Sequence, residues 1–209
     1  EKSGFTLCAV LPSAEGLPMH QELFNYGAKK IYNIEDPKLE TYQNDYFAKA
    51  VHTLIEQEKP EIILYGATTI GRSLAPTVAV MGWAGLTADC TELDFDTERQ
   101  ILLQTRPAFG GNIMATIICP DHRPQMATVR SNVFKKERVS ESETGEVIDV
   151  KVDLSDVRER MKRVESVVEE VNTVDLKAAD YIVSGGRGIG KPENFKLIEE
   201  LAGTLGGAV

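Results

Sequence analysis

The first ninety residues alternate short apolar runs with amphipathic segments, and no other feature limits the possible folds as strongly. The apolar runs at residues 5–11, 31–34 and 61–67 have the length and content of buried strands. The segments between them, residues 19–26 and 44–58, place apolar side chains at helical spacing. Parallel strands need a crossover, usually a helix, to join them. The pattern therefore predicts an α/β fold: an open, mostly parallel, nucleotide-binding-like sheet with helices on both faces.

Residues 61–80 contain one complete strand-turn-helix unit, with the turn at residues 68–72 and the helix at residues 73–80. Open parallel sheets bind their ligands outside the carboxyl ends of the strands. The stretch from Gly66 to Arg72 is therefore a candidate site. The other interpretation is a connecting turn whose glycines only relieve backbone strain. The sequence leaves both interpretations open.

The pattern changes after residue 86, where short strands separated by turns replace the strand-helix alternation. The predicted strands are residues 91–96, 101–106 and 113–118, with a hairpin turn at residues 96–99. They predict a small antiparallel extension of the domain. The later segments comprise a polar loop at residues 137–145, a half-exposed strand at 147–154, and residues 158–171, which fit either a helix or a strand.

Two further segments, residues 106–112 and 123–130, each tie arginine to a rigid turn near apolar residues. One interpretation is the solvated edge of a small sheet. The other is a protein interface, where arginine and aromatic residues concentrate. The sequence does not decide between them.

A second strand-loop-helix unit begins near the end of the sequence. Residues 181–183 predict a strand, residues 184–190 a glycine-rich loop, and residues 192–205 a helix with Pro192 in its first turn. A lone unit of this kind cannot build a parallel sheet, so we expect the sequence to be cut at its C-terminal end. The predicted domains are residues 1–172, an N-terminal α/β domain, and residues 173–209, a linker and the beginning of a second α/β domain.

The glycine-rich loop is the strongest local signal for a binding site. Glycines let the backbone approach a ligand, and N–H groups before a helix favour a phosphate. Arg187 adds a fixed positive charge. The loop departs from the dinucleotide fingerprint, because Lys191 stands where the third glycine should be. The candidate cofactor-binding residues are Gly185, Gly186, Arg187 and Gly188, and a plain strand-to-helix turn is the alternative.

Composition and spacing argue against several other functions. The net charge is −9 and the short basic runs are interleaved with acids, which argues against a nucleic-acid partner. No apolar run approaches the roughly 20 residues of a transmembrane helix, so we expect no membrane insertion. The three cysteines form no CxxC pair and the three histidines have no metal-ligand spacing. We expect reduced thiols, a cytoplasmic protein, no metal site and no catalytic residues.

Several motifs, taken in their order along the chain, identify a resemblance. They are GLTADC at residues 85–90, RPAFGGN at 106–112, ICPDHRPQM at 118–126, TVR at 128–130, SGGRG at 184–188, ENF at 193–195 and LAGTL at 201–205. Over nearly its whole length the sequence resembles the electron transfer flavoprotein alpha subunit. The form of the third motif is similar to a bacterial branch that includes electron-bifurcating members.

The resemblance implies an N-terminal α/β domain, a C-terminal domain that binds FAD, and a homologous beta subunit as partner. Such a heterodimer carries electrons between flavoprotein dehydrogenases, of the acyl-CoA type or others, and quinone-linked or ferredoxin-linked acceptors. The family's FAD-contacting arginine falls on Arg187. Residues 87–89, 110–112 and Arg130 fall in regions that we assign to subunit contact.

Two departures from the family pattern affect this interpretation. The sequence stops before the family's further FAD-binding motifs, and it lacks the family's opening strand and helix. We therefore expect a fragment that does not hold FAD tightly alone, because one loop cannot bury a dinucleotide. The main prediction is an electron carrier rather than an enzyme with its own substrate. The alternatives are a free-standing nucleotide-binding α/β enzyme and a structural module that docks a beta subunit.

Overall fold

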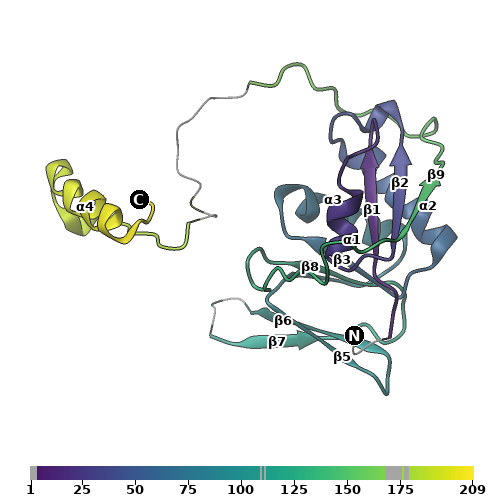
Figure 1. Cartoon of the computed structure of the whole chain (residues 1–209), viewed down its shortest axis with the longest axis horizontal. Coiled ribbons are helices and arrows are strands. Elements are labelled where there is room, and N and C mark those ends of the chain that lie inside the picture. The colour runs from purple at the N-terminus through teal and green to yellow at the C-terminus, as the bar shows by residue number, and fades with distance from the viewer. Residues whose placement is uncertain (1–3, 109, 111, 168–175, 177–178) are drawn as a thin grey trace. The chain divides into compact units, whose positions relative to one another are not determined.

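The protein forms two compact units, residues Glu1–Lys162 and Arg163–Val209, each of which we describe by itself. A computed structural model describes residues 4–108, 110, 112–167, 176 and 179–209 (Figure 1). The domain boundary predicted at residues 172–173 lies outside the described residues and stays a prediction. The segment at 158–171 was left open between helix and strand. Its residues 158–167 form neither, and residues 168–171 lie outside the described part.

The first unit contains two parallel sheets of three strands. One has the order β1 (Cys8–Ser13), β2 (Lys30–Glu35) and β9 (Glu146–Val150). The other has the order β3 (Ile62–Gly66), β8 (Gln125–Val129) and β4 (Leu86–Cys90). The prediction of a mostly parallel α/β fold is confirmed, although the hydrogen bonding divides the strands between two sheets.

In the described part of the first unit, these sheets are covered by the helices α1 (His20–Asn25), α2 (Asn44–Glu58) and α3 (Thr69–Met81), with a 3-10 turn, η1 (Pro37–Leu39), before α2. On β2, Ile31 packs with α1 whereas its neighbour Tyr32 packs with α2. Successive strand residues point to opposite faces of a sheet. Helices therefore lie on both faces of the first sheet, as the sequence predicted.

Helix α2 joins the two sheets through two apolar clusters. One side of the helix, including Tyr46 and Leu54, packs with Ile34 of β2. The next side, including Val51, packs with α3 and with Met126 of β8. The bounds of α2 are those that its apolar periodicity predicts, with Lys59 in the left-handed region and a proline after it. None of the helices in the described part of the chain is long and apolar enough to cross a membrane.

A separate antiparallel sheet is formed by the part of the chain between β4 and β8, where the sequence predicted a small antiparallel extension. Its strands are β5 (Glu92–Asp96), β6 (Ile101–Pro107) and β7 (Met114–Ile117), in that order (Figure 1). The Asp96 carboxylate accepts hydrogen bonds from the backbone N–H groups of Glu98 and Arg99, both at 3.0 Å. This aspartate turn fixes the hairpin between β5 and β6.

The segment at residues 123–130 was left open between the solvated edge of a small sheet and a protein interface, and most of it is neither exposed nor at an edge. It forms β8, the central strand of the second parallel sheet, and its first four residues are at most 1% exposed. The polar Gln125 is tolerated there because its side chain accepts a hydrogen bond from Leu102 N–H and donates one to the Gln100 carbonyl.

Two other features differ from what the sequence predicted. Strand β4 was not predicted. The predicted turn at 68–72 mostly belongs to α3, which starts at Thr69 because the Thr68 hydroxyl caps it by accepting from Gly71 N–H.

The second unit begins a strand-loop-helix arrangement. Ile182 forms a parallel bridge with Ala208, and between them lie η2 (Arg187–Ile189), η3 (Pro192–Phe195) and α4 (Lys196–Leu205). The predicted helix at residues 192–205 is present, with a 3-10 first turn. Ala202 is buried, whereas its neighbour Leu201 is half exposed.

We predict that Gly71→Ala destabilises the first unit. A Cβ atom at Gly71 would overlap the carbonyl oxygen of Gly66, so the variant must push α3 away from β3. We expect a loss of about 1–3 kcal/mol in the free energy of unfolding, measured with urea. Thr69→Ala, at an exposed position in the same turn, should stay within about 0.5 kcal/mol of the parent. Equal effects of the two variants would contradict this role for Gly71.

Candidate functional site

The glycine-rich loop lies between an extended segment and helix α4. The Val183 N–H donates to the Ala208 carbonyl at 2.8 Å, and the Ala208 N–H donates to the Tyr181 carbonyl at 2.9 Å. These bonds hold the segment before the loop beside the segment after α4. The loop thus leaves the carboxyl end of one extended segment and enters a helix, which is the place where α/β folds bind ligands.

The glycines of the loop have two different structural roles. A Cβ atom on Gly185 would lie 3.0–3.2 Å from side-chain atoms of Ile198, Ile189 and Phe195, so this glycine lets the loop pack against α4. Added Cβ atoms on Gly186 and Gly188 would meet nothing within 4 Å in the described structure. The backbone at those two residues is therefore open to a ligand, whereas Gly185 has a packing role.

Arg187 is exposed at the start of η2, between the two open glycines. Among the described residues its guanidinium has no carboxylate partner, so its charge is available to an anion. The Asn194 side chain donates a hydrogen bond to the Ile189 carbonyl at 2.9 Å and ties the loop to η3. The four predicted binding residues thus lie together, and Gly186, Arg187 and Gly188 form the accessible part.

The other candidate stretch, from Gly66 to Arg72, belongs to a charged network at the carboxyl ends of β3, β4 and β8. Arg130 donates to Asp89 from Nη2 to Oδ2 at 2.6 Å and from Nε to Oδ1 at 3.3 Å. Arg72 Nη2 reaches Asp89 Oδ1 at 3.4 Å, and its Nε donates to the Ala67 carbonyl. Asp89 occupies a left-handed conformation, φ +62°, in an irregular part of β4. The network ties three strand ends together, which favours a structural role for this turn.

The sequence did not predict this network, because it assigned Asp89 and Arg130 separately to subunit contact. The hydrogen bond from Arg130 is the main cause that holds the pKa of the Asp89 carboxyl below its usual value, and the charges of Arg130, Arg72 and Arg106 add to it. Of the neighbouring segment predicted for subunit contact, Gly110 and Asn112 lie between β6 and β7, and residue 111 is outside the described part.

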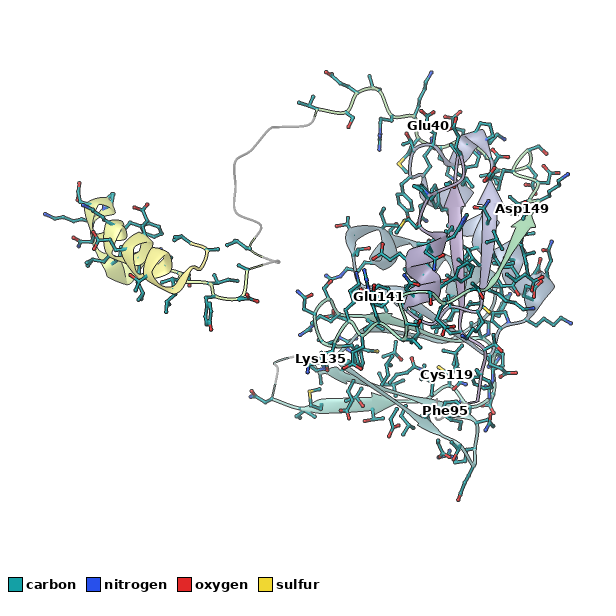
Figure 2. All side chains as sticks on the ribbon, in the orientation of Figure 1. Glu40, Phe95, Cys119, Lys135, Glu141 and Asp149 are labelled. Carbon is teal, nitrogen blue, oxygen red and sulfur yellow. The ribbon has the colours of Figure 1, made fainter. Side chains whose placement is uncertain are left out.

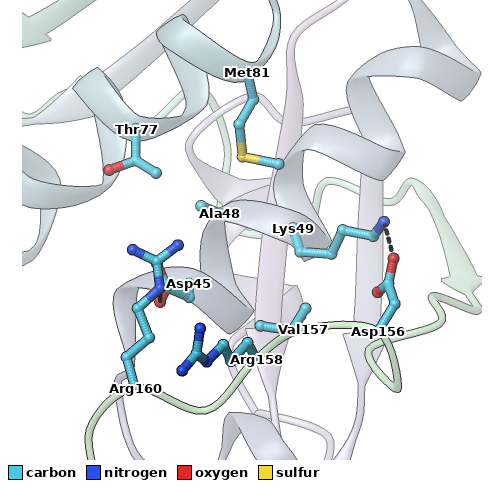
Figure 3. A pocket seen from close by; sticks show the side chains of 9 residues that line it. All are labelled: Asp45, Ala48, Lys49, Thr77, Met81, Asp156, Val157, Arg158 and Arg160. Carbon is cyan, nitrogen blue, oxygen red and sulfur yellow. Dashed lines mark hydrogen bonds and ion pairs between the residues drawn. The ribbon is translucent and has the colours of Figure 1, made fainter.

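A cavity of about 400 Å³ lies elsewhere in the first unit, between α2, α3 and residues 156–160 (Figure 3). Its charged side chains largely neutralise one another. Lys49 Nζ lies 3.0 Å from Asp156 Oδ2, and Arg160 Nε lies 3.3 Å from Asp45 Oδ2. These ion pairs fasten residues 156–160 to α2. The cavity is therefore better explained by the attachment of this segment than by a ligand.

The cysteines and histidines form no metal site in the described part of the chain, where no group of three or more His, Cys, Asp or Glu residues could hold an ion. Cys8, Cys90 and Cys119 are free thiols. They lie on separate segments: Cys8 in β1, Cys90 in β4, and Cys119, labelled in Figure 2, between β7 and β8.

Comparison with known families matches both units of the chain. The electron transfer flavoprotein domain matches residues 1–155, and the electron transfer flavoprotein FAD-binding domain matches residues 175–209. The second match includes the glycine-rich loop.

Comparison with curated proteins gives the same result. The electron transfer flavoprotein subunit alpha of Thermoanaerobacterium thermosaccharolyticum is 48% identical over 209 residues, which is 100% of this chain and 63% of that protein. The subunit of the same name from Megasphaera elsdenii is 48% identical over 203 residues, 96% of this chain and 60% of that protein. The acryloyl-CoA reductase electron transfer subunit beta of Anaerotignum propionicum is 39% identical over 235 residues, 100% of this chain and 64% of that protein. The chain spans less than two thirds of the length of these relatives.

We predict that Asp89→Asn weakens the dependence of stability on pH. Because the pKa of Asp89 is lowered in the folded protein, its stabilising contribution is present at pH 7 and is lost as the pH falls through the carboxyl range, below about pH 4. The variant should lower the urea midpoint at pH 7 and reduce the difference between the midpoints at pH 7 and pH 3. Glu98→Gln, on the exposed β5–β6 turn, is the control. An unchanged pH dependence in Asp89→Asn would count against the network.

Proposed function

We propose a function on the basis that the chain belongs to the electron transfer flavoprotein family. The full-length protein is an alpha subunit that carries electrons on FAD between flavoprotein dehydrogenases and quinone-linked or ferredoxin-linked acceptors. The observation that carries this proposal is the match of the FAD-binding domain to residues 175–209, which contain the open glycine loop. The family match also favours an electron carrier over a free-standing nucleotide-binding enzyme.

The residues of the loop fit one end of an FAD molecule. The open backbone at Gly186 and Gly188 allows close approach, and the charge of Arg187, which has no carboxylate partner among the described residues, attracts an anionic group. When bound, FAD supplies the reversible acceptance and release of electrons that an electron carrier needs. The protein contributes the binding surface and the charge beside the cofactor.

The proposed partner is a beta subunit, which the names of the alpha-subunit relatives imply. One relative is named as an electron transfer subunit of an acryloyl-CoA reductase. That name supports an acyl-CoA-type flavoprotein dehydrogenase as one class of electron donor or acceptor. Three free thiols and bacterial relatives support a location in the bacterial cytoplasm.

We predict that the 209-residue chain alone binds FAD weakly. The loop offers two open glycines and one arginine, which is too little surface to bury a dinucleotide. Titration of FAD with the purified chain, followed by flavin fluorescence, should show no saturation at micromolar concentration. Tight, stoichiometric binding would contradict the prediction and would place the main FAD contacts within these 209 residues.

We predict that Arg187→Ala makes the flavin of the full-length alpha–beta complex harder to reduce. Removing a positive charge beside the flavin removes a Coulomb attraction that favours its reduced anionic ring. The measurement is a redox titration of the complex, and we expect a more negative midpoint potential. Arg187→Lys keeps the charge and should retain most of the potential, and Lys191→Ala removes a nearby cation outside the open loop. An unchanged potential in Arg187→Ala would exclude the proposed role.

A further inference from the structure

The carboxyl end of the first parallel sheet carries polar side chains on the face that α1 covers. In the register of the sheet, Ser13 of β1 lies beside Glu35 of β2. One row earlier, Asn33 of β2 lies beside Asp149 of β9. Asn33 and Glu35 follow Ile31 at steps of two, so they point to the same face as Ile31, which packs with α1. Three neighbouring strands therefore place four oxygen-bearing side chains on one face.

Two of these four side chains are buried and carry polar atoms without a partner. Ser13 is 7% exposed and Asn33 is 5% exposed. Among the described residues, neither the Ser13 hydroxyl nor the Asn33 Oδ1 atom has a hydrogen-bond partner. Native proteins pair nearly all of their buried polar groups, and a bound ion is one explanation of an exception.

The other two side chains are carboxylates that lie close together. The Asn33 Nδ2 atom donates to Glu35 Oε1 at 2.7 Å and to Asp149 Oδ1 at 3.1 Å. Both oxygens are thus within hydrogen-bond distance of one nitrogen atom, and two like charges in such proximity repel each other. In the described part of the chain, neither carboxylate forms an ion pair with a lysine, arginine or histidine. A cation at this place would remove the repulsion.

The loop after β1 passes directly over one of the carboxylates. A Cβ atom on Gly16 would lie 2.9 Å from Glu35 Oε1, so a larger residue would have to push the carboxylate aside. Glu35 and Asp149 are themselves exposed. The four side chains thus form a shallow site with a buried floor, Ser13 and Asn33, and a charged rim that an ion can reach from solvent.

We propose that Ser13, Asn33, Glu35 and Asp149 bind a hard divalent cation, Mg²⁺ or Ca²⁺. Carboxylate, amide and hydroxyl oxygens are the ligands that such ions take. The two carboxylates neutralise the charge of the ion. The Ser13 hydroxyl supplies a neutral oxygen, and a half turn of the Asn33 amide brings its Oδ1 atom toward the carboxylates.

The bound ion would join the ends of β1, β2 and β9, and would thereby stabilise the first unit. The site contains two carboxylates, fewer than the three or more acidic, histidine or cysteine ligands of a strong centre, so we expect half-saturation at about 0.1–1 mM. The site uses no residue of the glycine-rich loop, and the inference does not depend on the proposed function.

Isothermal titration calorimetry of the full-length alpha subunit tests the site. The protein is first freed of metal with EDTA, and CaCl₂ and MgCl₂ are then titrated separately at constant KCl. Glu35→Gln and Asp149→Asn each remove one charged ligand with little change in shape. Ser13→Ala removes an oxygen that bonds to no described residue, so this variant should keep its fold. Glu40→Gln makes the same charge change at an exposed carboxylate outside the site and is the control (Figure 2).

We expect one saturable site in the parent chain. Glu35→Gln and Asp149→Asn should each weaken binding about tenfold or more, and Ser13→Ala about threefold, whereas Glu40→Gln should stay within about twofold of the parent. Circular dichroism checks the fold of each variant, and Ser13→Ala decides if a carboxylate variant does not fold. Saturation by one of the two ions alone would identify it as the ligand. The absence of saturable binding of both ions would overturn the proposal, and so would binding that the folded variants at the site leave unchanged.

Discussion

The packing of helix α2 against both parallel sheets is the contact on which the first unit depends. One side of the helix buries Tyr46 and Leu54 against the first sheet, and the adjacent side buries Val51 and Ile55 against α3 and the second sheet. Each large apolar side chain that is fully buried contributes roughly 1.5–3 kcal/mol. Since none of the described strands of one sheet is hydrogen-bonded to a strand of the other, the helix supplies much of their connection.

Periodicity predicted the elements whose side chains follow a simple pattern. Helix α2 was located to the residue, because its apolar face is regular and Pro60 follows it. Strand β8 was missed because Gln125 and Thr128 make it look half polar. Both are satisfied by distant partners, Gln125 by Leu102 and Thr128 by the N–H of Asp89. The sequence around β8 does not reveal hydrogen-bond partners that lie this far away in the chain. The start of α3 was missed although Thr68, a good capping residue, marked it.

In the candidate site too, some features can be predicted from neighbouring residues in the sequence, whereas others depend on residues far apart in the chain. The loop at residues 184–190 could be located from sequence because glycines and a following helix are local signals. The separate role of Gly185 could not, since it depends on where Phe195 of η3 and Ile198 of α4 come to lie. The Asp89–Arg130 pair joins residues 41 positions apart in the chain, and the pairing of β4 with β8 brings them together. Neither residue type nor spacing identifies such a pair beforehand.

The apolar edge strand β7 has a consequence for how the chain behaves at high concentration. In the described part of the chain, no strand pairs with the outer side of β7. An uncovered apolar strand can recruit any extended segment, including partly folded copies of the same chain. Encounters between copies become more frequent as the concentration rises, so the tendency to associate through this edge grows with the amount of chain present.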